Sequence, residues 1–106
     1  MNTEATEPPK RSYETVFGEV NAKFNALIDS SRKDSAPLDL NRSGALLPDY
    51  ESLRTYLEAV REEVNTLDIL EKFKDELAGV IESRLLTVQN YINILQAEED
   101  RKKGSA

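Results

Sequence analysis

The sequence predicts an all-α protein: a short first amphipathic helix, a linker, and a helical hairpin with a long C-terminal helix, forming a helical bundle or a coiled coil. Three observations support this fold class. Apolar residues recur at steps of three and four in three stretches, which is the period of one helix face. Charged residues make up 32% of the chain and apolar residues 39%, a balance typical of helices with broad solvated faces. Small polar residues and a proline separate the first stripe from the second.

The first helix is predicted from Ser12 onward. Ser12 can cap it by accepting a hydrogen bond from an otherwise unpaired backbone N–H of the first turn. The preceding segment, 1–11, has two adjacent prolines and no apolar period, so it is expected to be a disordered tail. The polar run and the proline of 29–37 end the helix. The apolar stripe of this helix comprises Tyr13, Val16, Phe17, Val20, Phe24, Leu27 and Ile28.

A linker is expected at about 32–47, with the second helix starting at Pro48, where a missing N–H costs nothing. The run Ala45-Leu46-Leu47 just before it is interpreted as a seam, in which an apolar residue packs back on the first turn of the next helix. The alternative is a short linear docking motif displayed by the linker. Its candidate residues are Leu38, Leu40, Leu46 and Leu47.

Two further stripes follow with no glycine or proline between them. A single helix from Pro48 to Lys102 would be roughly 80 Å long, far longer than a compact domain of this size. A slip of the stripe at 65–68 and a capping pair of Asp68 with Glu71 favour a hairpin over this continuous rod. The second stripe is Leu53, Tyr56, Leu57, Val60, Val64 and Leu67, and the third is Leu70, Phe73, Leu77, Val80, Ile81, Leu85, Val88, Tyr91, Ile92 and Leu95.

The predicted domain spans 12–103, with Gly104 as the helix cap and 104–106 as a C-terminal tail. The second helix would measure roughly 25 Å and the third roughly 50 Å, so half of the third helix would need cover from the first helix or from another chain. Arg84 interrupts this part of the stripe. Its stem either lies on the core with the guanidinium in water, or the guanidinium meets a carboxylate on another helix or a partner. The candidate partner interface is Arg84, Leu85, Val88, Tyr91, Ile92 and Leu95.

Composition disfavours catalysis. The chain has no histidine and no cysteine, which excludes Ser-His and Cys-His nucleophiles and nearly every zinc-binding pattern. The four glycines stand alone, so there is no glycine-rich phosphate loop. Acidic pairs such as Glu62-Glu63 fall on polar helix faces and are interpreted as solvated surface. We therefore expect a protein that is not an enzyme, with no catalytic residue, no cofactor and no metal site.

The charge and the apolar pattern also bear on partners. A net charge of −6 and a pI near 4.7 disfavour nucleic acid and anionic membranes. No window approaches the roughly 18 apolar residues of a membrane span, and the first residues lack the apolar run of a signal peptide. These features predict an intracellular protein, cytoplasmic or nuclear.

The expected function is a non-enzymatic interaction subunit that contributes helices to a larger assembly. Its protein partner would be held in a hetero-complex or in a homodimer through the third helix, because half of that helix lacks cover. The alternative is a self-contained helical adaptor domain whose groove binds a peptide helix or a short motif. In that case Tyr50, Tyr56 and Leu57 would lie near one entrance.

Overall fold

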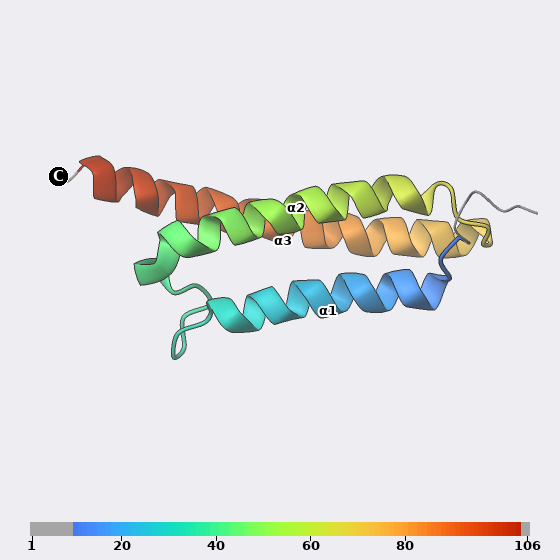
Figure 1. Ribbon diagram of the computed structural model, residues 1–106, viewed down its shortest axis with the longest axis horizontal. Coiled ribbons are helices and arrows are strands. Elements are labelled where there is room, and N and C mark those ends of the chain that lie inside the picture. The colour runs from blue at the N-terminus through green and yellow to red at the C-terminus, as the bar shows by residue number, and fades with distance from the viewer. Residues whose placement is uncertain (1–9, 105–106) are drawn as a thin grey trace, which may run out of the picture.

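A computed structural model of the protein describes residues 10–104, and the described residues form an all-α fold, as predicted (Figure 1). The prediction of a tail therefore falls outside the described residues for 1–9 and 105–106. The four helical elements are α1 (Tyr13–Ser31), the 3₁₀ helix η1 (Leu40–Arg42), α2 (Ser43–Val64) and α3 (Glu71–Gly104). The only β-type pairing within this range is an isolated bridge between Lys33 and Ala36.

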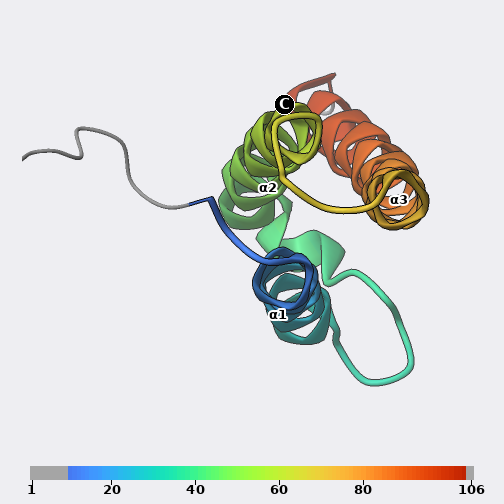
Figure 2. The same cartoon turned by 90° about the vertical axis from the view of Figure 1, so that its right-hand side faces the viewer.

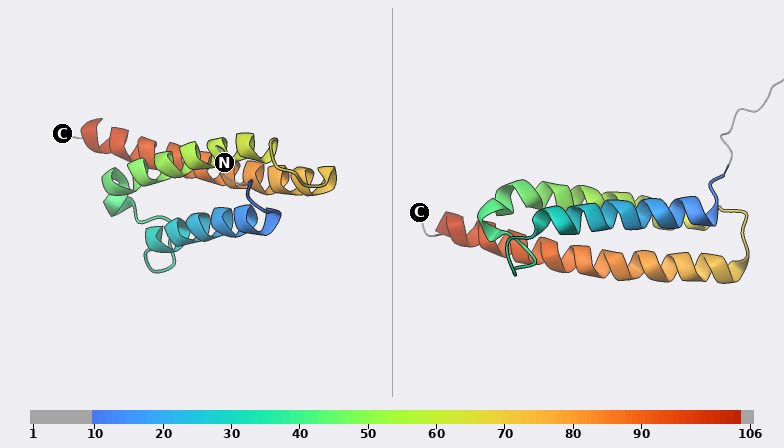
Figure 3. Two further views of the ribbon diagram at one scale, coloured as in Figure 1. Left: turned by 45° about the vertical axis from the view of Figure 1, so that its right-hand side comes forward. Right: turned by 90° about the horizontal axis from the view of Figure 1, so that it is seen from below.

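The three α-helices lie side by side, and an end-on view places them at the corners of a triangle (Figure 2). α2 and α3 form an antiparallel hairpin, and α1 lies along both of them. α1 runs parallel to α3, because the side-chain contacts Tyr13–Glu76 and Asn21–Arg84 both join residues 63 positions apart. The bundle is elongated, with a radius of gyration of 17.4 Å, and Figure 3 shows α3 extending past the start of α2.

The hairpin prediction is confirmed, and the continuous rod is excluded. α2 ends at Val64 and α3 begins at Glu71, with Leu67 buried in the connection. The predicted capping pair is not formed as expected, because Glu71 is the first residue of α3 and so cannot take the third position of a capping box. The carbonyl of Leu70 begins the helix by accepting from the N–H groups of the third and fourth residues after it, at 2.9 and 3.1 Å.

The predicted start of the second helix at Pro48 is wrong. α2 begins five residues earlier, at Ser43, so the linker is shorter than 32–47. The reason is that burial at steps of four and three continues from Tyr50 past the proline to Leu46 and Ser43. Pro48 is exposed inside the helix and removes only its own bond to the carbonyl of Gly44, a residue that water can reach.

Two predicted tails are also shorter than expected. Lys10 and Arg11 belong to the folded unit, since the ammonium of Lys10 donates to the carbonyl of Thr66 at 2.5 Å and Arg11 is ion-paired to α1 and α2. At the other end, Gly104 is the last residue of α3 and has no positive φ, so it is not the left-handed cap that was predicted.

The early start of α2 gives the bundle a single continuous core. The Ser43 hydroxyl donates to the Glu99 carboxylate near the end of α3, and the Tyr50 ring packs edge-on against Tyr91 with centroids 5.6 Å apart. The buried Ser31 hydroxyl closes the same region from α1, lying 2.7 Å from the Tyr50 oxygen. The buried apolar residues are Val16, Val20, Phe24, Leu38, Leu46, Tyr50, Leu53, Leu57, Val60, Val64, Leu67, Leu77, Ile81, Val88, Ile92 and Leu95.

Candidate functional site: the groove between α1 and α3

The predicted partner interface on α3 is largely internal. Val88 and Leu95 are fully buried, Ile92 is 6% exposed, and Leu85 and Tyr91 are half-buried against the core. The register of the hairpin explains this correction, because Tyr50 packs on Tyr91 and Arg54 bonds to Gln89, so α2 lies over this part of α3. These side chains mainly hold the chain together.

The candidate linker motif is not displayed either. Leu38 and Leu46 are buried, and Leu47 is half-buried in α2. Only Leu40 is exposed, at the start of η1. Of the aromatic entrance suggested for a peptide groove, Tyr50 and Leu57 are fully buried. Tyr56 is half-buried, bonds to Glu19 through its hydroxyl and lines a hollow on α2.

One open feature of the bundle is the seam between α1 and α3; another is the hollow on α2, of about 530 Å³, which is lined by Pro48, Glu51, Ser52, Thr55 and Tyr56. Two hollows, of about 880 and about 440 Å³, follow each other along the seam between α1 and α3 and share Tyr13. We call their shared seam the α1/α3 groove. The larger hollow lies at the end of the bundle where α2 turns into α3, and the smaller one lies further along the seam. The groove is lined by Lys10, Arg11, Ser12, Tyr13, Glu14, Phe17, Asp68, Ile69, Leu70, Phe73, Glu76, Gly79, Val80, Ser83 and Arg84.

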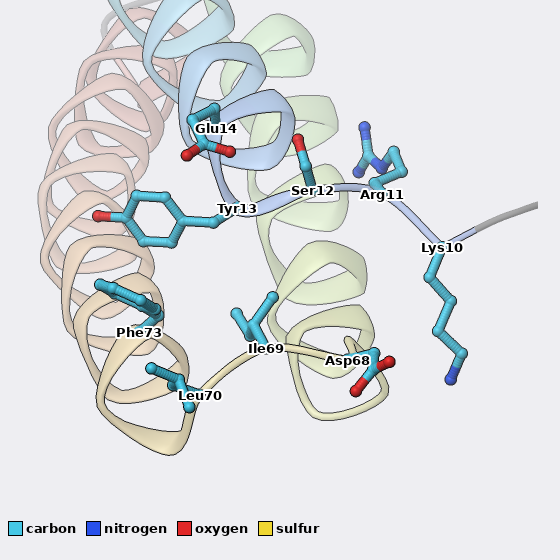
Figure 4. Close-up of a pocket in the computed structure, with 9 residues that line it drawn as sticks. All are labelled: Lys10, Arg11, Ser12, Tyr13, Glu14, Asp68, Ile69, Leu70 and Phe73. Carbon is cyan, nitrogen blue, oxygen red and sulfur yellow. The ribbon is translucent and has the colours of Figure 1, made fainter.

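Aromatic and aliphatic side chains form the floor of the larger hollow. Figure 4 shows Tyr13 from α1 beside Phe73, with Ile69 and Leu70 of the connection below them. The ring centroids of Tyr13 and Phe73 are 5.2 Å apart, and Phe17 continues the row at 5.6 Å from Tyr13. Leu70 is 64% exposed, so this apolar end of the groove faces solvent.

Polar contacts across the groove are few. The Tyr13 hydroxyl donates to the Glu76 carboxylate at 3.3 Å, and burial together with the charge of Glu76 raises the pKa of Tyr13. Between this contact and Arg84 the α3 wall is made of small or half-buried residues. At Gly79 an added Cβ would meet nothing within 4 Å, so there is free space above this part of the helix.

Arg84 closes the far end of the groove and is incompletely paired. One guanidinium nitrogen donates to the Asn21 side chain at 3.2 Å, and the guanidinium carbon lies 4.7 Å from the centroid of the Phe24 ring. Its Nε is buried without a hydrogen-bond partner, and no carboxylate of residues 10–104 lies within 4.0 Å of it. Of the alternatives given for Arg84, an ion pair with a carboxylate on another helix is therefore not formed within residues 10–104. A buried donor without a partner is uncommon in folded proteins and calls for an explanation.

A second polar cluster, missed by the sequence analysis, fastens α1 to α2. The Arg11 guanidinium donates two bonds to the Glu63 carboxylate, at 2.6 and 2.8 Å, and a third to Glu19 at 2.8 Å. The Tyr56 hydroxyl also donates to Glu19, at 2.5 Å. The bonds to Arg11 and Tyr56 hold the pKa of Glu19 below its usual value, and those to Arg11 lower the pKa of Glu63. Burial, and then the bond to Glu19, raises the pKa of Tyr56. Because Arg11 had been assigned to the tail, no sequence pattern pointed to this cluster.

Three further findings bear on function. Within residues 10–104, no three or more His, Cys, Asp or Glu side chains gather as a metal site. None of the helices in this range is long and apolar enough to cross a membrane. Comparisons of the chain with protein-family models, curated proteins and solved structures gave no match.

Proposed function

We propose that the chain is a non-enzymatic protein–protein interaction subunit whose α1/α3 groove receives an amphipathic helix of a partner protein. The observation that carries this proposal is the half-buried row of Tyr13, Phe73 and Phe17 along the seam between α1 and α3, where two hollows follow each other. Apolar grooves between helices are a common place for a helix to dock. The partner helix would complete a four-helix arrangement, to which this chain contributes α1, α2 and α3.

The dimensions of the groove suit a helix. From Phe73 to Arg84 it extends roughly 17 Å along α3, the length of about three helical turns. A docked amphipathic helix places apolar residues at i, i+4 and i+7 on one face, which matches a row of this length. The free space above Gly79 lets the partner approach α3 closely.

The charges along the groove add a chemical requirement. Among the described residues the Arg84 guanidinium bonds only to Asn21 and has no carboxylate partner, which supports a partner that carries Asp or Glu where it passes this residue. A guanidinium and a carboxylate form strong paired hydrogen bonds, and a site away from bulk water strengthens them. The expected partner face is therefore apolar over Tyr13, Phe17 and Val80, with an acidic residue at the Arg84 end.

The test is site-specific photo-crosslinking in cells, with a benzophenone side chain at groove residue Glu76 or at Glu58 on the exposed face of α2. We expect Glu76 to give a distinct adduct that Glu58 does not give. Gly79→Gln, which fills the groove without touching the core, should remove this adduct. Gly18→Gln is the matched control, because Gly18 is also a helical glycine with nothing within 4 Å of an added Cβ and does not line the groove.

Three outcomes would contradict the proposal: adducts that are the same from both positions, an adduct that persists in Gly79→Gln, or an adduct lost equally in Gly18→Gln. Circular dichroism of the two glutamine variants checks that both stay helical. The carboxylate requirement has its own measurement: Arg84→Gln should weaken the Glu76 adduct more than Gly18→Gln does. An unchanged adduct in Arg84→Gln would remove the acidic residue from the expected partner.

A further inference from the structure

One side of α3 presents an uncharged stripe to solvent. We call the exposed residues Ser83, Leu86, Asn90, Ile94 and Ala97 the outer stripe; their spacing of three and four puts them on one helix face. Leu86 is 73% exposed and Ile94 40%. Between 79 and 97 the only exposed charged residue of α3 is Glu82, and its carboxylate is paired with Arg61 of α2 at 2.7 Å.

The spacing and the residue types of the outer stripe are symmetric about its central residue. Its steps are three, four, four and three, and its residues are small, aliphatic, amide, aliphatic and small, with Asn90 at the centre. We propose that the outer stripe pairs with the outer stripe of a second copy of this chain, with the two α3 helices antiparallel and Asn90 on the two-fold axis. This register places Leu86 against Ile94 of the second copy and Ser83 against its Ala97.

Each layer of this pairing is chemically matched. The Asn90 amide has both donors and an acceptor, so two copies related by a two-fold axis can satisfy each other. A single asparagine in an apolar helix seam is a known means of fixing register and orientation. Leu86 and Ile94 bury apolar surface on either side of it, and the small residues at the ends let the helices approach closely.

The composition of the stripe favours a second copy over a charged partner, since its centre offers no ion pair. The outer side of α1 also has few charges, but its exposed residues Gly18, Ala22, Asn25 and Ala26 include no large apolar side chain. The stripe is roughly 21 Å long, so two copies would bury on the order of 800 Å² in total, below the range of stable complexes. Pairing is therefore expected to be weak and to depend on concentration.

This inference goes beyond the proposed function, because it assigns a second copy of the chain to the outer stripe, which adjoins the α1/α3 groove at Ser83. In the proposed register the second copy's α3 beyond Ala97 passes over Gly79, so the dimer and a docked partner helix would compete for this part of α3. The two proposals are tested by different experiments, so either can be contradicted without the other. The groove is tested by an adduct to another protein from Glu76, whereas the stripe is tested with the purified chain alone.

The first experiment is sedimentation equilibrium of the full chain from about 10 to about 500 micromolar, spanning weak protein affinities. We expect the mass to rise from 12.0 kDa toward twice that value, and added salt should favour the dimer by screening the repulsion between two chains of net charge −6. Leu86→Lys should keep the chain monomeric over this range. Leu70→Lys, the same change at a leucine that is 64% exposed outside the stripe, should dimerise like the natural chain. A monomer at every concentration, or equal behaviour of the two lysine variants, would overturn the proposal.

The second experiment tests the register and uses the fact that the chain has no cysteine. Under mild oxidation Asn90→Cys should form a disulfide-linked dimer. Ser83→Cys alone and Ala97→Cys alone should not, whereas a mixture of the two should give a mixed dimer. Crosslinking of Ser83→Cys with itself would indicate parallel helices. That result would contradict the antiparallel arrangement even if the chain dimerises.

Discussion

The two sides of α3 differ in how they meet their neighbours. Toward α2 the buried stripe is unbroken and polar pairs close its edge, with Arg61 to Glu82 at 2.7 Å and Arg54 to Gln89 at 2.9 Å. Toward α1 the contacts across the seam are longer, with Asn21 to Arg84 at 3.2 Å, and a groove lies between the helices. The same helix can therefore complete a core on one side and present a receiving surface on the other.

The difference has a physical origin in the side chains on the two seams. Leucine and valine at steps of three and four interlock where α2 crosses α3. On the α1 side, Phe17 and Tyr13 stand opposite small or polar positions such as Gly79 and Ser83. Because glycine has no side chain, the space above Gly79 is left unfilled, and a groove remains between α1 and α3.

The largest expected effect tests the closed side. Leu57→Ala removes a fully buried side chain of α2 and should lower the free energy of unfolding by roughly 2 to 5 kcal/mol. Val80→Ala, on the open side, removes a half-buried side chain and should cost about 1 kcal/mol or less. Urea denaturation followed by circular dichroism measures both. Equal losses would show that the seam between α1 and α3 is as tightly packed as the other one.

An intermediate effect is expected at the ion pairs that fasten α1 to α2. Arg11→Gln should lower the free energy of unfolding by about 1 kcal/mol at pH 7, because Arg11 serves two carboxylates but all three side chains remain about one-third exposed and partly screened. Lys10→Gln, which removes a single exposed contact to the Thr66 carbonyl, is the control and should cost less.

The pH dependence of this effect follows from the lowered pKa values of Glu19 and Glu63. In the unfolded chain these carboxyls take up protons near about pH 4.3, whereas in the folded chain they stay charged to lower pH. Their contribution to stability is thus complete above about pH 5 and is lost as the pH falls through the folded pKa values. The difference between the natural chain and Arg11→Gln should shrink over this window. A constant difference down to pH 3 would contradict the assignment.

The smallest expected effect is at Arg84. Arg84→Met removes the contacts of the guanidinium with Asn21 and with the Phe24 ring, but it also removes a buried donor that has no partner. Because these effects oppose each other, the free energy of unfolding should change by less than about 0.5 kcal/mol. A loss above about 1.5 kcal/mol would show that this residue serves the fold and would weaken its assignment to a partner.

Much of the fold was predictable from the 3.6-residue period. The first helix, its Ser12 cap and the break between Val64 and Glu71 all follow from local patterns, and the structure has them. The start of α2 was misplaced because Pro48 was given the first helical position, although Leu46 continues the stripe upstream. A proline at a helix start is a preference, and here the burial of Ser43 and Leu46 outweighs it.

The candidate site could be predicted only in part. Arg84 stood out because a charge interrupts an apolar stripe, but the stripe does not tell which neighbouring helix the charge will meet. The groove depends on the parallel pairing of α1 with α3, which brings Phe17 next to Val80 from far apart in the sequence. Local periodicity carries no information about such long-range register, so the buried stripe on α3 was mistaken for the open surface.

The Arg11 cluster also determines how α1 would respond to a mechanical force. The helix is covalently attached to the rest of the bundle only through the loop that follows Ser31, and its other end is held by Lys10 and Arg11. The contacts of these two cations therefore lie roughly 28 Å from the loop, at the opposite end of the helix. A force applied to the chain ahead of Lys10 would act on the contacts of Lys10 and Arg11 before it acted on the loop after Ser31.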